Sequence, residues 1–107
     1  MWRPYQSGTT IGQAGSEGGV IVQDDEHVFG ARITLEQCER KPFRFAITCG
    51  IYLRFFHTHY CGSEREARTD VERMKTEIQR ILDLIEAEST DDDVYQAISD
   101  FTNRFPT

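Results

Sequence analysis

One stretch of the chain, residues 43–61, limits the fold more than any other. It reads FRFAITCGIYLRFFHTHYC, which is rich in aromatic and β-branched residues and contains no proline. Its apolar side chains alternate along the sequence and fall on odd positions: Phe43, Phe45, Ile47, Ile51, Leu53 and Phe55. Alternation with a period of two is typical of a strand that buries one face. The stretch therefore predicts two strands of an antiparallel hairpin.

The register of this hairpin depends on where its turn is placed. A three-residue turn at residues 48–50 puts Gly50 last, where a left-handed backbone suits glycine. It also pairs Ile47 with Ile51 and keeps the apolar residues on one face. A two-residue turn would bring a phenylalanine onto the face of an arginine, so we prefer the three-residue turn.

A second hairpin precedes the first in the sequence. Residues 20–23 and 28–35 are runs of β-branched or aromatic residues, and the polar residues 24–27 between them are typical of a four-residue loop. This pairing predicts one buried face made of Val20, Val22, Phe29, Ala31, Ile33 and Leu35.

A long amphipathic helix is predicted after Gly62. Ser63 and Glu66 form an S-x-x-E capping box, in which the serine hydroxyl accepts a hydrogen bond from a backbone N–H of the first turn. Apolar residues then recur at intervals of three and four, as on one face of a helix: Ala67, Val71, Met74, Ile78, Ile81, Leu82 and Ile85. We expect this stripe to cover the apolar face of the sheet.

A shorter second helix follows. Thr90 can cap it together with Asp93, and it should end before Pro106. Its predicted buried side consists of Val94, Ala97, Ile98, Phe101 and Phe105.

The predicted architecture is α+β: a four-stranded antiparallel meander followed by a long amphipathic helix and a second, shorter helix. A short strand near Trp2 would make the sheet five-stranded. Residues 7–19 hold five of the eight glycines and almost no core-forming side chain, so residues 1–19 are expected to be an N-terminal segment with a flexible connection. Residues 20–107 are expected to form a single domain.

Composition excludes several classes of function. The chain has 107 residues, 12 Lys and Arg against 18 Asp and Glu, and a net charge of −6, which repels nucleic acid and anionic membranes. No apolar run approaches the roughly 20 residues that span a bilayer. Three cysteines form no disulfide framework. These features favour a cytoplasmic protein with reduced thiols.

The strand that ends at Cys61 carries the pattern His57-x-His59-x-Cys61. Residues two apart on a strand point the same way, with Cβ atoms roughly 7 Å apart, so these three side chains could be neighbouring ligands of one Zn²⁺ ion. The alternative is that one histidine is hydrogen-bonded to Glu66 or Asp70 of the following helix.

Two further candidates follow from the predicted hairpin. The register exposes Cys49 at the turn, far from His57, so the thiol has no base to activate it. On the outer sheet face, Arg44 stands opposite Arg54, and like charges in that position repel each other. The whole set on this face is Arg32, Arg44, Tyr52, Arg54 and Phe56. An acid of this chain, an acidic partner surface or an anionic ligand should neutralise its arginines.

No set of acid, base and nucleophile stands at a readable spacing, so an enzyme is not favoured. The sequence instead favours a protein-interaction module that uses the outer sheet face, with a second copy of itself or another protein as its partner. Zinc binding through His57, His59 and Cys61 is the alternative function.

Overall fold

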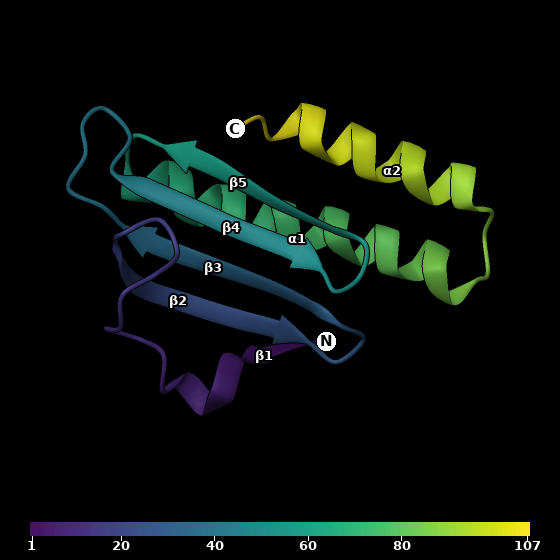
Figure 1. The fold of residues 1–107 in the computed structure, drawn as a ribbon, viewed down its shortest axis with the longest axis horizontal. Helices are drawn as coiled ribbons and strands as arrows, with labels where there is room; N and C mark the ends of the chain where they lie inside the picture. Colours follow the sequence, from purple (N-terminus) through teal and green to yellow (C-terminus); the bar gives the residue numbers. More distant parts are fainter.

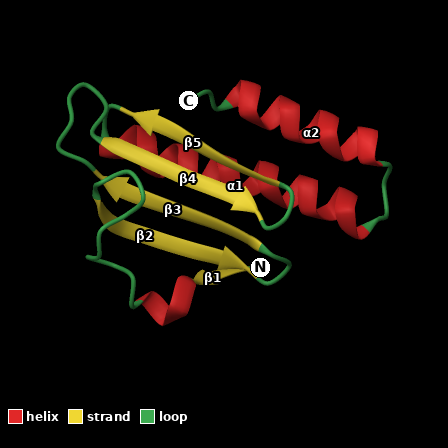
Figure 2. Ribbon diagram, in the orientation of Figure 1, coloured by secondary structure: helices red, strands yellow, loops and turns green.

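The sheet consists of five antiparallel strands in sequence order, so each strand lies beside its neighbour in the chain (Figures 1 and 2). The computed structural model describes residues 1–107. The strands are β1 (Trp2–Pro4), β2 (Val20–His27), β3 (Ala31–Gln37), β4 (Phe45–Ile51) and β5 (Phe55–Cys61). The predicted α+β meander is confirmed, with the N-terminal strand as its fifth member. A short 3-10 helix, η1 (Tyr5–Gly8), follows β1.

Both predicted helices are present, and their caps are the predicted ones. In α1 (Glu64–Glu86) the Ser63 hydroxyl accepts from the Glu66 backbone N–H at 3.2 Å. In α2 (Asp91–Arg104) the Thr90 hydroxyl accepts from the Asp93 N–H at 3.2 Å. Neither helix is long and apolar enough to cross a membrane.

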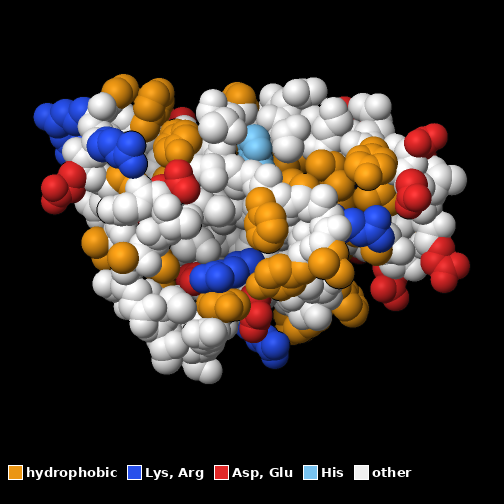
Figure 3. Space-filling view, viewed as in Figure 1, with side chains coloured by type: hydrophobic (Ala, Val, Ile, Leu, Met, Phe, Trp, Pro, Cys, Tyr) orange, Lys and Arg blue, Asp and Glu red, His pale blue; other side chains and the backbone are white.

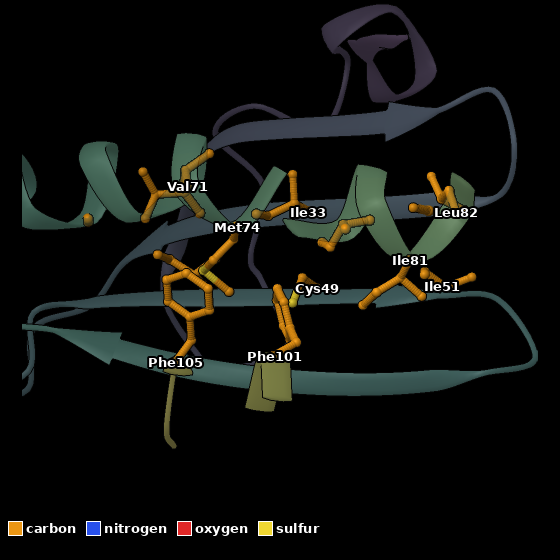
Figure 4. Packing of buried hydrophobic residues seen from close by; sticks show 14 of the residues in the cluster. Ile33, Cys49, Ile51, Val71, Met74, Ile81, Leu82, Phe101 and Phe105 are labelled. Carbon is orange, nitrogen blue, oxygen red and sulfur yellow. The ribbon is translucent and has the colours of Figure 1, made fainter. Parts of the chain in front are cut away.

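The core lies between one face of the sheet and α1 (Figure 4). The odd-numbered residues of β3 and β4 form the sheet side of this core, and the apolar stripe of α1 packs against them. Phe101 of α2 and Phe105, which follows the end of that helix, enter the same cluster beside β5. Burying each large apolar side chain contributes about 1.5–3 kcal/mol. The stripe residues that are fully buried are Ala67, Val71, Met74, Ile78, Ile81 and Leu82.

The predicted turn of the second hairpin is wrong. Residues 52–54 make the turn, and seven residue pairs join the two strands, beginning with Ile51 and Phe55. Gly50 lies inside β4 with an ordinary strand backbone, and Leu53 takes the left-handed conformation, with φ 68°. A shift by an even number of residues leaves the alternation intact, so apolar spacing could not separate the two registers. The observed register makes the longer ladder and leaves Leu53 fully exposed.

The predicted loop of the first hairpin is also wrong. Residues 24–27 belong to β2, and the turn lies at residues 28–30, where Gly30 has φ 100°. Phe29 is exposed at this turn, and Val20 is half exposed at the other end of the hairpin. The polar stretch remains in the sheet because its side chains find distant partners, as Asp25 does with Lys75 of α1 at 2.7 Å.

The N-terminal segment lies on the sheet face away from the helices. β1 pairs with β2, and the Thr10 hydroxyl donates to the Asp24 carboxylate at 2.8 Å. Farther along, the backbone N–H groups of Glu17 and Gly19 both donate to the fully buried carboxylate of Glu36 at 3.1 Å. The flexible connection expected within residues 1–19 stays a prediction, but the segment has defined contacts with the outer face.

The close approach of β5 to Gly50 predicts a stability effect. A Cβ atom at this position would overlap the Phe55 carbonyl oxygen, which belongs to the backbone and cannot rotate away. Gly50→Ala should therefore lower the free energy of unfolding by about 1–3 kcal/mol. Urea denaturation measures this free energy. Gly62→Ala is the control, because its nearest neighbour would be at 3.4 Å. Equal stability of the two variants would contradict this packing.

Candidate functional site

β5 is an edge strand, and one side of its backbone has no partner. Successive residues of a strand direct their N–H and C=O groups to opposite sides. The Tyr52 N–H donates to the Gly30 carbonyl at 2.9 Å, so even-numbered residues of β4 pair with β3 and odd-numbered ones with β5. In β5 the odd-numbered residues therefore pair back to β4. The N–H and C=O groups of Phe56, Thr58 and Tyr60 face the open edge.

The sequence of β5 lacks three features that often protect an edge strand. Edge strands are commonly blocked by charged side chains, by proline or by being short. At the opposite edge, β1 is three residues long and carries Arg3 and Pro4. In contrast, β5 has seven residues, FFHTHYC, and none is Asp, Glu, Lys, Arg or Pro. The side chain of Phe56 is also 74% exposed.

Apolar side chains flank this edge on the surface. Figure 3 shows them in several groups over the sheet face, with acidic side chains gathered at the far end of the helices. A hollow of about 420 Å³ lies on the outer face between the N-terminal segment and the last strands. Its lining includes Gly15, Ser16, Arg32, Gly50, Tyr52 and Phe56.

Arg32, predicted as part of an anion-binding face, is neutralised by an acid of the same chain. Its Nε and Nη2 atoms donate to the two carboxylate oxygens of Asp24 at 2.9 and 2.7 Å. The Asp24 side chain has no exposed surface and also accepts from Thr34. The ring of Tyr5 lies 3.6 Å from the guanidinium carbon. Hydrogen bonding to Asp24 raises the pKa of Arg32, so the arginine stays charged and paired.

The opposition of Arg44 and Arg54 is wrong, because it followed from the wrong register. Arg44 precedes β4, whereas Arg54 lies in the turn at the other end of that strand. Of the five predicted residues, the structure brings together Arg32, Tyr52 and Phe56, which line the hollow on the outer face.

The buried Asp24 carboxylate supports a second stability prediction. Asp24→Ala leaves Arg32 without its counter-ion and removes the acceptor of Thr10, so the free energy of unfolding should fall by about 2–4 kcal/mol. Limited proteolysis should also cut faster within residues 1–19. Glu26→Ala breaks the exposed pair with Arg3 and should cost about 1 kcal/mol or less. Equal losses in the two variants would contradict the role given to Asp24.

The structure does not bring His57, His59 and Cys61 together as one set of ligands. The Nε2 atom of His57 is hydrogen-bonded to the Phe105 carbonyl oxygen, outside any cluster of ligating atoms. His59 and Cys61 instead lie close to Asp70 of α1. The bond between His59 and Asp70 is the histidine–carboxylate bond that the sequence offered as the alternative. His59 Nε2 lies 2.9 Å from Asp70 Oδ2, and Cys61 Sγ lies 3.6 Å from the same oxygen.

These three side chains form a compact, sheltered cluster. One ligand atom from each lies within 4.8 Å of the others. The side chains of His59 and Asp70 are only 12% and 11% exposed, and Cys61 is buried. Asp70 lies beside the apolar stripe of α1, and a carboxylate at such a buried position needs a polar partner because burying an unpaired charge is costly. The sequence pointed to Asp70 as a hydrogen-bond partner, but not as the third member of a cluster.

Cys49 is not exposed at a turn, as the sequence predicted. It is buried in the core of β4, directly across from His57 in the register. Burial raises the pKa of the Cys49 thiol to about 12. Burial, followed by the nearby charges of Asp70 and Glu66, raises the pKa of Cys61 to about 12 as well. Neither thiol is an activated nucleophile near neutral pH.

These shifts predict slow alkylation. At pH 8 a thiol of pKa about 12 is ionised in only about one molecule in 10,000, and the thiolate is the reactive form. Iodoacetamide should therefore leave Cys49 and Cys61 unmodified in the folded protein and modify both in urea. Peptide mass spectrometry gives the extent at each site. Rapid modification of either thiol in the folded chain would contradict its burial.

Comparison with protein-family models, with curated proteins and with solved structures found no match for this chain.

Proposed function

We propose that this chain is a non-enzymatic protein-interaction module that binds an extended segment of a partner protein along the open edge of β5. The observation that carries the proposal is an unblocked edge strand beside exposed aromatic side chains. An added strand would take up the free backbone groups of Phe56, Thr58 and Tyr60. Peptide recognition by strand addition draws its affinity from such main-chain bonds and its specificity from pockets for alternate side chains.

One hollow lies on the outer face beside this edge, and a second lies on the helix side near the turn where β5 begins. On the outer face is the hollow between the N-terminal segment and Phe56. On the helix side, a hollow of about 320 Å³ lies between the turn after β4 and α2. Its lining includes Leu53, Val94 and Ile98. A strand with apolar residues at alternate positions suits these two surfaces.

The position of α2 favours a single strand over a second copy of the chain. In Figure 1, α2 lies alongside α1 and past the β5 edge. A second copy joined through its own β5 would bring another pair of helices to the same side of the sheet. An isolated segment needs only the width of one strand, about 4.8 Å. The partner in this proposal is therefore an extended segment with alternating apolar side chains, and self-association is the competing arrangement.

A cytoplasmic location belongs to the same proposal. All three cysteines are free, and each is buried. Such thiols suit a reducing compartment. The net charge of −6 gives no attraction to nucleic acid.

The proposal is tested by replacing Thr58, whose N–H faces the open edge. Thr58→Pro removes that N–H and blocks strand addition, yet it breaks no internal backbone bond, as proline at a sheet edge allows. Thr58→Val is the matched control, because it keeps the N–H and the β-branched shape. A random-peptide library displayed on phage is selected against the unchanged chain. Selected peptides should bind Thr58→Val normally and Thr58→Pro about tenfold or more weaker.

Two further measurements decide the outcome. Thermal melts must show that both variants fold. If no peptide is enriched, or if the enriched peptides bind Thr58→Pro normally, strand addition is wrong. If light scattering shows a dimer that Thr58→Pro converts to a monomer, the edge is occupied by a second copy and the proposed partner is wrong.

A further inference from the structure

The cluster around Asp70 brings together the donor atoms of a transition-metal site. An imidazole nitrogen, a thiol sulfur and a carboxylate oxygen meet within 4.8 Å of one another. They come from two elements, because His59 and Cys61 lie on β5 and Asp70 lies on α1. In tetrahedral sites these atoms bind Zn²⁺ at about 2.0–2.3 Å. The observed separations of 2.9 and 3.6 Å from Asp70 Oδ2 are near those of ligands sharing one ion.

The orientation of His59 is that of a metal ligand. Its Nδ1 lies 2.7 Å from the Pro106 carbonyl oxygen. A carbonyl can only accept, so Nδ1 carries a proton. In the neutral ring this leaves a lone pair on Nε2, and that atom faces the carboxylate oxygen of Asp70. Two acceptors cannot face each other at 2.9 Å without a positive charge between them. A proton on Nε2 or a bound metal ion supplies this charge.

The surrounding residues hold the carboxylate, and a surface hollow lies beside His59. Arg73 Nη1 lies 3.2 Å from Asp70 Oδ1, which turns the other oxygen, Oδ2, toward His59 and Cys61. Such outer bonds orient the ligands of metal sites. A surface hollow of about 620 Å³ is lined in part by His59, Tyr60 and Pro106, so one member of the cluster borders it.

We propose that His59, Cys61 and Asp70 bind a divalent ion of the zinc class, with a fourth position open to water or another small ligand. A thiolate and an imidazole favour Zn²⁺ over Mg²⁺ or Ca²⁺, which take oxygen ligands. On binding, the Cys61 thiol proton and the proton between His59 Nε2 and Asp70 pass to solvent, and the thiolate, the imidazole nitrogen and the carboxylate bond to the ion. The site differs from the one suggested by the sequence, because Asp70 takes the place of His57.

The bound ion would link three parts of the fold. It would join β5 to α1, and through the bond from His59 to Pro106 it would also hold the C-terminal residues against β5. Because the unfolded chain does not hold the three ligands together, ion binding should stabilise the folded state.

Cobalt is the spectroscopic probe for this site. Titration of the metal-free protein with Co²⁺ should give one equivalent of binding, with thiolate-to-cobalt charge-transfer absorption in the near ultraviolet. Cys61→Ser should abolish that absorption. Cys38→Ser, which changes a cysteine outside the cluster, should leave it unchanged. Asp70→Asn should weaken binding about tenfold or more, because an uncharged amide is a poorer ligand.

His57→Ala separates this site from the one suggested by the sequence. The variant should keep both stoichiometry and absorption, because His57 is bonded to Phe105 and lies outside the cluster. Circular dichroism of each metal-free variant shows whether it is folded. Loss of the cobalt signal in folded His57→Ala, or its persistence in folded Cys61→Ser, overturns the assignment.

A measurement on the unchanged chain covers the case in which a variant does not fold. Free Zn²⁺ at about 100 times its dissociation constant should raise the melting temperature by roughly 10 °C or more, and a chelator should reverse the rise. No rise, together with no cobalt spectrum, means that a proton alone holds His59 and Asp70 together, and the metal site is wrong. The result does not depend on the peptide experiment, because Thr58 is outside the cluster.

Discussion

The apolar face shared by β3, β4 and β5 can be buried only because α1 lies across it. The stripe of α1 and the odd-numbered residues of β3 and β4 meet in one cluster, to which Phe101 of α2 and Phe105 also belong. Neither surface is stable in water alone, since a sheet with one apolar face needs a covering layer. This contact also fixes which side of β5 faces inward, and so directs His59 and Cys61 toward α1.

The other sheet face is organised by polar contacts. Two buried carboxylates, Asp24 and Glu36, accept hydrogen bonds from the N-terminal segment and hold it on the sheet. Asp24 also pairs with Arg32, so the arginine that the sequence offered as an anion site is already neutralised. Most of the outer face is therefore satisfied internally. The backbone at the β5 edge has no strand partner.

The two proposed sites both use β5, and strand geometry keeps them separate. Its odd-numbered side chains point toward the helices, where His59 and Cys61 meet Asp70. Its even-numbered residues present Phe56 and Thr58 on the outer face, and their backbone groups face the open edge. A single seven-residue strand can thus offer a metal cluster on one face and a docking edge on its side.

Local sequence signals determined the elements of this protein. Period-two alternation over residues 43–61 predicted strands, spacing of three and four predicted the stripe of α1, and Ser63 and Thr90 marked the two helix starts. These signals depend on side chains that are close in sequence, so one chain is enough to read them. The α+β class, the strand order and most of the core follow from them.

Only the tertiary structure decided the registers and therefore the sites. In the second hairpin the turn lies at residues 52–54, four residues from the predicted position, and an even shift leaves the alternation unchanged, so apolar spacing could not reveal it. In the first hairpin the polar residues 24–27 resembled a loop, but they belong to β2 because their side chains find partners such as Lys75 and Arg32, and the turn lies at residues 28–30. The position of the second turn places Arg44 and Arg54 at opposite ends of β4 and places Cys49 in the core, directly across from His57. Asp70 joined His59 and Cys61 because α1 crosses the sheet at β5. Such contacts between distant residues depend on how the elements pack, and local sequence pattern does not encode them.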